Sequence, residues 1–410
     1  MNKKIIILMF LIAITFTANS QSTGWSIQSS PTTQNLRSIA FSSVNTCIAV
    51  GDAGTILRSS DGGITWTIIS SPVADALRGV SLRGSIGLAV GISGRMIRST
   101  DSGLSWVELT RQTTRNLYCV SISDVFTVIM GHEGTIFVSY DNGLTWISKG
   151  AGTASILFGV SAYSTTAVGV GGQGAVVMSP NSGVGWGLTI LGGQLTFFYG
   201  TSFVSTTTGW AVGSNVSPGY IIIKSTNSGF VWSAQTAPIT EQLFGVSFAT
   251  VDSGTAVGSG GTIIHTTNSG TTWAIQTSGT TQILNGVSFA NSNLGIAVGD
   301  LGTILRTTNS GLTGIRPENN SLPSGFGLSQ NYPNPFNPVT NINFSVPKEG
   351  FVNLSVYDIL GNKVNELVNE NIKAGDYSMK FDASGLSSGV YFYTIKTNDF
   401  SSTKKMVLTK

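Results

Sequence analysis

The sequence predicts an all-β protein: a seven-bladed β-propeller closed by its N-terminal strand, followed by a small C-terminal β-sandwich. Three observations lead to this fold class. A short turn motif recurs about every forty residues, strand-like segments separated by glycine-rich turns fill each interval, and helical periodicity is absent. A fixed period of this length is typical of propellers and solenoids. Four short strands per period describe one propeller blade.

The recurring motif reads [ST]-x-[DN]-x-G-x-x-W. Its Asp or Asn can accept backbone N–H bonds, its glycine supplies a positive φ, and its Trp opens the next strand with a large apolar ring. Because the later copies carry neutral Asn, the position needs a hydrogen-bond acceptor and not a charge. We therefore expect a structural role for these residues: Asp61, Trp66, Asp101, Trp106, Asp141, Trp146, Asn181, Trp186, Asn227, Trp232, Asn268, Trp273 and Asn309.

The two ends of the repeat region complement each other. Trp25 opens a segment like those that follow the other motif copies, yet no copy precedes it. The seventh copy has Gly314 where a Trp should stand and is followed by no fourth strand. We predict that residues 25–28 pair with the strand around Ile304 and Leu305. This pairing would complete the seventh blade and leave no open sheet edge.

The chain divides into four predicted segments. Residues 1–20 read as a secretion signal, with a basic start, a short apolar run and a small-residue cleavage site before Gln21. Residues 21–313 form the propeller, 314–327 a linker and 328–410 the β-sandwich. No other stretch is long and apolar enough for a transmembrane segment. We expect an exported monomer.

Composition argues against several function classes. The formal charge is only +3 and no basic run appears, which argues against nucleic-acid binding. His132 and His265 are the only histidines, so a His-based triad or zinc site has almost nothing to draw on. We expect no cofactor and no metal. Cys47 and Cys119 are expected to be separate buried thiols rather than a disulfide.

The repeats resemble the Asp-box (BNR) repeats of sialidases and related glycosidases. In their length and in the phrases G-x-A-V-G and G-T-I-L-R-T-T-N-S-G, they resemble more closely the photosynthesis system II assembly factor type of propeller. The resemblance implies the fold. One propeller scaffold hosts many activities, so it leaves the function open.

The last eighty residues resemble the type A C-terminal sorting domain of type IX secretion substrates. The resemblance rests on four segments: residues 332–338, 356–361, 389–393 and 404–407. It implies export through the outer membrane by the type IX machinery, acting through residues 328–410. It also implies release from the cell or attachment to its surface.

Two functions remain open at this point. One is a non-catalytic module that binds a glycan or a protein, for which Arg37, Arg78, Arg111 and Arg115 would give a mildly positive ligand face. The alternative is a glycoside hydrolase of the sialidase or xyloglucanase-like Asp-box type. Such an enzyme needs two carboxylates about 5–9.5 Å apart. Asp52 and Asp300, from adjacent blades, are the candidates, and Glu133 is expected in an equivalent turn further round. We favour the binding module.

Overall fold

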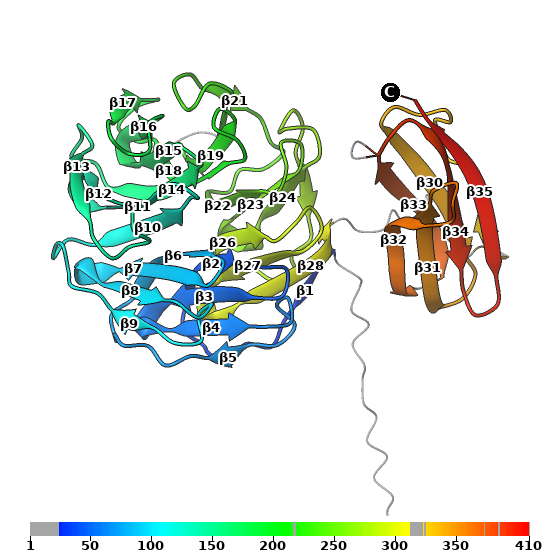
Figure 1. Ribbon diagram of the computed structural model, residues 1–410, viewed down its shortest axis with the longest axis horizontal. Coiled ribbons are helices and arrows are strands. Elements are labelled where there is room, and N and C mark those ends of the chain that lie inside the picture. Colours follow the sequence, from blue (N-terminus) through cyan, green and yellow to red (C-terminus); the bar gives the residue numbers. More distant parts are fainter. Residues whose placement is uncertain are drawn as a thin grey trace, which may run out of the picture. The chain divides into compact units, whose positions relative to one another are not determined.

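The computed structural model describes residues 24–215, 219–311, 323, 325–372, 374–383 and 386–409 (Figure 1). The predicted secretion signal and most of the predicted linker lie outside these residues. The chain splits into two compact units, Met1–Gly311 and Leu312–Lys410. No helix in the described ranges is long and apolar enough to span a membrane.

The first unit is a β-propeller built from four-stranded antiparallel sheets, each of which is one blade. Blades 1 to 3 contain β2 (Leu36–Phe41), β3 (Cys47–Gly51), β4 (Ile56–Ser59), β5 (Thr67–Ile68), β6 (Leu77–Arg83), β7 (Ile86–Gly91), β8 (Met96–Ser99), β9 (Val107–Glu108), β10 (Leu117–Ile122), β11 (Thr127–Gly131), β12 (Thr135–Ser139) and β13 (Ile147–Gly150). Blades 4 and 5 contain β14 (Leu157–Tyr163), β15 (Thr166–Gly171), β16 (Ala175–Ser179), β17 (Gly187–Ile190), β18 (Phe197–Phe203), β19 (Gly209–Ser214), β20 (Ile221–Ser225) and β21 (Ser233–Gln235).

Blade 6 contains β22 (Leu243–Phe248), β23 (Gly254–Gly258), β24 (Ile263–Thr266) and β25 (Ala274–Gln276), and blade 7 contains β26 (Leu284–Phe289), β27 (Gly295–Gly299), β28 (Ile304–Gly311) and β1 (Gly24–Ile27). The first strand of the chain is thus the fourth strand of the last blade. Its register pairs Ser26 with Arg306 and Ile27 with Leu305, which confirms the predicted partner. Trp25 is fully buried and meets Phe289 edge to face at 6.0 Å.

The first strand of each blade lies innermost (Figure 1). These strands contact one another in chain order, and β26 contacts β2. A serine near the end of one innermost strand accepts a backbone N–H from the next: Ser81 from Ile122, and Ser121 from Ala162, at 3.1 and 2.9 Å. This bond explains the serine of the Val-Ser pair that recurs in most of these strands, because it satisfies a backbone donor between blades.

In blades 1 to 6 the Asp-box turns join the third and fourth strands, and in blade 7 the Asp-box residues lie at the end of β28. In the turn of blade 2, Asp101 accepts the backbone N–H and the hydroxyl of Ser105, and the Ser99 hydroxyl accepts the N–H of Gly103. Gly103 has a φ of 82°, and a Cβ there would lie 2.4 Å from Ile48 of blade 1. The turn therefore needs glycine both for its conformation and for its packing against the neighbouring blade.

Most Asp-box turns are also fastened to the preceding blade by a side-chain donor. The acceptor is the backbone carbonyl of the residue after the Asp or Asn. The donors and acceptors are Arg306 and Gly62, Arg58 and Ser102, Arg98 and Asn142, Tyr140 and Ser182, Gln235 and Ser269, and Gln276 and Ser310, at 2.8 to 3.1 Å. These bonds give the Asp boxes a structural role between blades. Cys47 and Cys119 are buried free thiols, as predicted.

The second unit is a β-sandwich. One sheet contains β29 (Gly327–Leu328), β30 (Val339–Val346) and β33 (Gly375–Asp382), and the other contains β32 (Lys363–Ile372), β31 (Gly350–Tyr357), β34 (Gly389–Lys396) and β35 (Ser401–Leu408). The two sheets share one apolar core.

The terminal strand β35 of this unit is held by the segment that precedes β30. The backbone of Phe336 bonds to Val407 and Thr409, and the side chain of Asn334 accepts the N–H of Val407. The buried Tyr393 hydroxyl accepts the N–H of Asn331 at 2.7 Å. Two of the sequence segments that resemble the sorting domain, 332–338 and 404–407, are therefore bonded to each other.

Candidate binding surface at the inner rim

Every innermost strand of the propeller begins with a β-bulge. In blade 1, for example, Leu36 pairs with Gly51 and Ser38 with Val50, which leaves Arg37 as the extra residue. Bulges often re-aim a side chain beside a functional site. We call the seven bulge residues the inner rim: Arg37, Arg78, Tyr118, Phe158, Tyr199, Phe244 and Asn285.

The inner rim lies at the ends of the blades opposite the Asp boxes. Each rim residue lies near the start of a first strand. That start pairs with the end of the second strand, just before the short 3-10 turn that leads to the third strand. All seven side chains are half-buried. Because the innermost strands contact their neighbours in order, these side chains surround the propeller axis on one face.

Blades 7, 1 and 2 give the rim a charged part. Arg37 donates to Asp52 through Nε and Nη2, at 3.1 and 2.6 Å, and its Nη1 lies 3.6 Å from Asp300. Asp52 and Asp300 each begin a 3-10 turn, η1 (Asp52–Gly54) and η6 (Asp300–Gly302). The two acids predicted as a pair thus meet across one guanidinium.

This arrangement is unsuited to general acid catalysis. The hydrogen bond from Arg37, with smaller contributions from Asn35 and Arg78, holds the pKa of Asp52 below its ordinary value. Its carboxylate in turn raises the pKa of Arg37. A general acid that works near neutral pH needs its pKa raised instead. Asp300 is engaged as well, since it accepts the amide of Asn285 at 2.8 Å.

Glu133 lies, as expected, in the turn of blade 3 that corresponds to the turns of Asp52 and Asp300, but at a different position within that turn. The residue equivalent to Asp52 and Asp300 in blade 3 is His132, and Glu133 is the second residue of its turn, η3 (His132–Gly134), with a φ of 52°. It lies 2.5 Å from Arg115 and 3.5 Å from His132. Its carboxylate is therefore paired.

Arg78 differs from Arg37 although both hold the same place in their blades. The turn of its own blade, η2 (Ile92–Gly94), begins with Ile92 where blade 1 has Asp52. Its nearest carboxylate is Asp52 of blade 1, at 3.8 Å. Its Nε is buried and has no hydrogen-bond partner among the described residues. The side chain as a whole is 32% exposed, so the other nitrogens of the Arg78 guanidinium are placed to donate to a ligand.

Blades 3 to 6 give the rim an aromatic part. The ring centroids of Tyr118, Phe158, Tyr199 and Phe244 follow one another at 5.4, 5.4 and 5.3 Å. Phe197 stacks on Tyr199 at 6.4 Å. We call the four rim residues the aromatic arc. Sequence reasoning missed the aromatic arc. An alignment of the seven repeats could have found it, because four consecutive innermost strands carry an aromatic residue at the same position.

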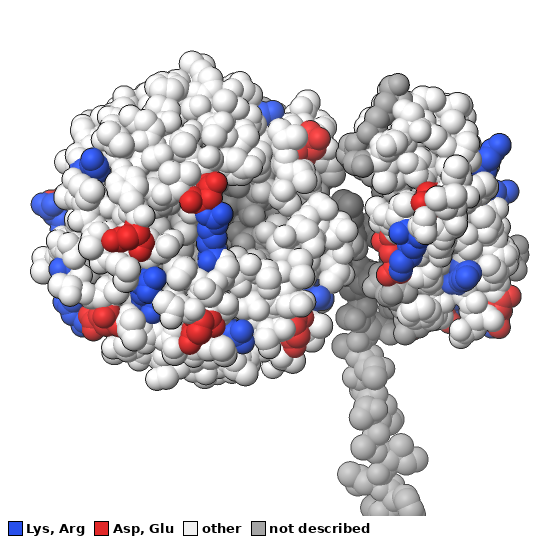
Figure 2. Space-filling view, viewed as in Figure 1, with Lys and Arg blue, Asp and Glu red and all other residues white. Residues whose placement is uncertain are grey.

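Each of the four arginines predicted to form a positive ligand face lies within 4 Å of a carboxylate. Arg37 and Arg78 lie near Asp52, Arg115 pairs with Glu133, and Arg111 lies 3.6 Å from Glu108. Charged side chains of both signs are sparse and interspersed on the face of the propeller in view (Figure 2). The arginines are therefore largely neutralised in place.

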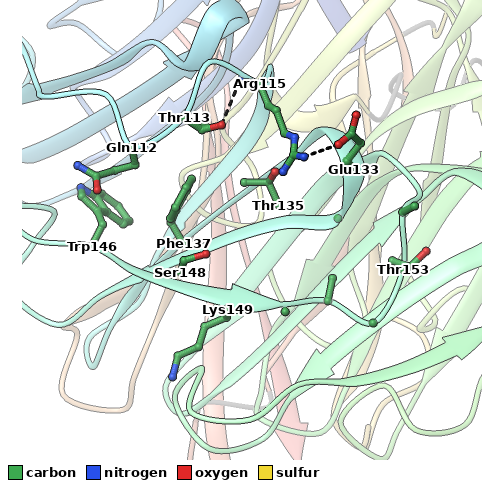
Figure 3. Close-up of a pocket in the computed structure, with 15 residues that line it drawn as sticks. Gln112, Thr113, Arg115, Glu133, Thr135, Phe137, Trp146, Ser148, Lys149 and Thr153 are labelled. Atoms are coloured by element: carbon green, nitrogen blue, oxygen red, sulfur yellow. Dashed lines mark hydrogen bonds and ion pairs between the residues drawn. The ribbon is translucent and has the colours of Figure 1, made fainter.

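A groove of about 850 Å³ lies on the outer side of blade 3. Trp146 and Phe137 form its apolar part, with Gln112 beside Trp146, and the Arg115–Glu133 pair lies along another part (Figure 3). A smaller groove of about 540 Å³ occupies the corresponding place in blade 1. Because the groove recurs, it follows from the shape of the blade. Among the described residues, no cluster of three or more His, Cys, Asp or Glu could hold a metal ion.

Comparison with family models gives two matches. Residues 330–409 match the secretion system C-terminal sorting domain. Residues 17–164 match the photosynthesis system II assembly factor YCF48. The comparison with curated proteins gave no match.

Solved structures extend the likeness over the whole propeller. A structure of YCF48 bound to D1 peptide is 18% identical with a TM-score of 0.58, covering 70% of this chain and 95% of that one. YCF48 from Cyanidioschyzon merolae is 20% identical with a TM-score of 0.57, covering 69% and 98%. The WD40 propeller of Doa1 is 13% identical with a TM-score of 0.55, covering 69% and 97%. At such identities the likeness shows the fold alone. The chain combines a β-propeller that is similar to YCF48 in its fold with a C-terminal sorting domain, which indicates export by type IX secretion to the cell surface or outside the cell.

Proposed function

We propose that this protein is a non-catalytic extracellular binding module whose ligand occupies the inner rim. The observation that carries the proposal is the composition of the rim. Seven equivalent positions hold an aromatic arc on one side and, on the other, Arg78, which is 32% exposed and has Ile92 in place of an acid in its own turn. Ligand sites are commonly apolar surfaces with a few placed polar groups, and the rim has this composition.

The export half of the proposal rests on the two ends of the chain. The secretion signal is removed before Gln21, and the sorting domain then directs the chain to the type IX machinery. N-terminal sequencing of the exported chain tests the first step. A start at Gln21 is expected, and a chain that still begins at Met1 contradicts it.

The binding role is favoured over hydrolysis by the state of the acidic residues. Asp52 accepts two bonds from Arg37 and has a lowered pKa, and Asp300 shares the same guanidinium. Glycoside hydrolysis needs one carboxyl group that stays protonated and a second that is free to act as a base or nucleophile. Asp52 is therefore not placed to stay protonated, and Asp300 is already engaged by the Arg37 guanidinium and the Asn285 amide.

The test uses the mature chain on an array of extracellular glycans and peptides, with product analysis of every bound probe. We expect binding without cleavage. The double change Tyr118→Ala and Tyr199→Ala should weaken binding at least tenfold. Tyr163→Ala, at the Asp-box end of β14 and 45% exposed, is the control and should bind like the parent chain. Released sugar products would establish the hydrolase alternative. Equal loss in the control would remove the inner rim as the site.

A further inference from the structure

We infer that the ligand of the inner rim is an uncharged sugar chain, such as a neutral polysaccharide segment. Its pyranose rings would stack on the aromatic arc and its hydroxyl groups would bond to Arg78, Asp52 and Asp300. This inference rests on the proposed function and names the chemical class of its ligand.

The aromatic arc supplies one half of the argument. Four rings from consecutive blades form an unbroken series with neighbouring centroids 5.3 to 5.4 Å apart, and all four are half-buried. Tilted rings in a row present large apolar surface at low cost in side-chain entropy. The C–H faces of pyranose rings are apolar and slightly positive, so they complement the negative faces of aromatic rings. A row of rings suits a row of sugar units.

The charged part of the rim supports an uncharged ligand with hydroxyl groups. Two guanidinium groups, Arg37 and Arg78, stand against two carboxylates, Asp52 and Asp300, so the formal charges cancel. Arg37 donates to Asp52 through two nitrogens, while the carboxylate nearest to Arg78 lies 3.8 Å away and the Arg78 side chain is 32% exposed. A hydroxyl group both accepts and donates hydrogen bonds. It can therefore accept from Arg78 and donate to a carboxylate without changing this balance.

Charged ligands fit this balance less well. An anion at Arg78 would lie close to Asp52, which is already 3.8 Å from that guanidinium, and like charges at such range repel. A cation would face Arg37 and Arg78 together. An uncharged ligand with many hydroxyl groups avoids both penalties, which is why we choose a neutral sugar over a uronate or an acidic peptide.

Comparison of blades 1 and 2 suggests a substitution that tests the role of Arg78 in ligand binding. Placing an acid at the start of the blade 2 turn, Ile92→Asp, gives Arg78 the own-blade partner that Asp52 gives to Arg37. This internal carboxylate should compete with the ligand for Arg78. The substitution is in a half-buried turn position that tolerates Asp in blades 1 and 7.

The experiment is calorimetric titration of the mature chain with cellohexaose, xylohexaose and mannohexaose, with hexagalacturonate and an acidic hexapeptide as charged probes. We expect at least one neutral probe to bind at least tenfold more tightly than either charged probe. Its affinity should change less than about twofold between low and high salt, since no net charge is neutralised. Phe158→Ala, Arg78→Ala and Ile92→Asp should each weaken it at least tenfold, and the control Tyr163→Ala should not.

The possible failures separate the two proposals. Tighter, rim-dependent binding of hexagalacturonate or the peptide would overturn the neutral-sugar inference while leaving the binding function in place. Binding of a neutral probe that is unaffected by Phe158→Ala and Arg78→Ala would overturn the inference and the inner rim as the site. Failure of all three neutral probes to bind would also overturn the inference. Circular dichroism of each variant would confirm that it remains folded.

Discussion

The two ends of the propeller blades differ in how much they vary from one blade to the next. At the Asp-box end, Ser or Thr, Asp or Asn, and Gly recur in each turn and make the same local hydrogen bonds. At the inner rim, the equivalent position holds Arg twice, Tyr twice, Phe twice and Asn once. Both ends belong to the same blades, whose strand arrangement is repeated, so the difference does not come from the backbone.

The difference separates structural from functional demands within one chain. A side chain that recurs in every blade satisfies a requirement that every blade has, such as a tight turn fastened to its neighbour. Side chains that differ at equivalent positions satisfy no common requirement of the blade. When such side chains also group into a charged part and an aromatic part, they define a surface with two distinct sides, which suits ligand recognition.

The largest effect is expected where the chain ends meet. Deleting residues 21–30 removes β1 from blade 7, leaves the edge of β28 unpaired and removes the fully buried Trp25. Loss of a buried Trp alone costs roughly 3–5 kcal/mol. We expect the propeller transition in thermal unfolding to fall sharply. A deletion variant that melts like the parent chain would show that β1 contributes nothing to the ring.

A second prediction compares the stability lost on truncating an aromatic side chain at each end of the blades. Trp106, at the Asp-box end, is only 7% exposed, so Trp106→Ala should destabilise the propeller by roughly 3–5 kcal/mol. Phe158 of the inner rim is half-buried, and Phe158→Ala should cost about 1 kcal/mol. Urea unfolding of both variants measures the contrast. Similar losses would mean that the rim aromatics serve the core as much as the Asp-box tryptophans do.

The repeat made much of the propeller predictable. The forty-residue period and the strand pattern within it indicated the blades, and the missing fourth strand after Asn309 indicated the partner of Trp25. These features are local, or they follow from counting strands. The hydrogen-bond acceptor role of the Asp-box Asp or Asn was predictable as well, because that position of the motif holds either residue.

The inner rim was less predictable because its geometry arises between blades. Arg37 meets Asp300 only because the last blade lies beside the first, which brings together residues far apart in the sequence. The bulge that exposes Arg37 is a matter of strand register, and no single residue type marks it. The turn that carries Glu133 was identified correctly, but its place within the turn was not, since G-H-E-G carries its acid at the second position and G-D-A-G at the first.

The smallest effect is expected from the Asp-box carboxylates. In blades 2 and 3, hydrogen bonds from the Ser105 and Thr145 hydroxyls, with backbone N–H bonds to the same carboxylates, lower the pKa of Asp101 and Asp141 to about 2. An unfolded Asp titrates near 3.9. Because the folded pKa is the lower one, this stabilisation is fully present above about pH 4 and is lost as the pH falls toward 2. The Asn turns have no such dependence.

Blade 6 indicates why neutral Asn can replace these acids. The Asn268 Oδ1 accepts the N–H of Thr272 at 2.9 Å, and its Nδ2 donates to the Thr272 hydroxyl at 2.9 Å, where Asp141 accepts from the Thr145 hydroxyl. Asp101→Asn and Asp141→Asn should therefore change the free energy of unfolding at pH 7 by less than about 0.5 kcal/mol. They should also flatten the decline in stability between pH 4 and pH 2. Urea midpoints measured across this range, with Asn268→Asp as the reverse variant, test both statements. A large loss at pH 7, or the loss of a bound metal, would assign the carboxylates a role beyond the turn.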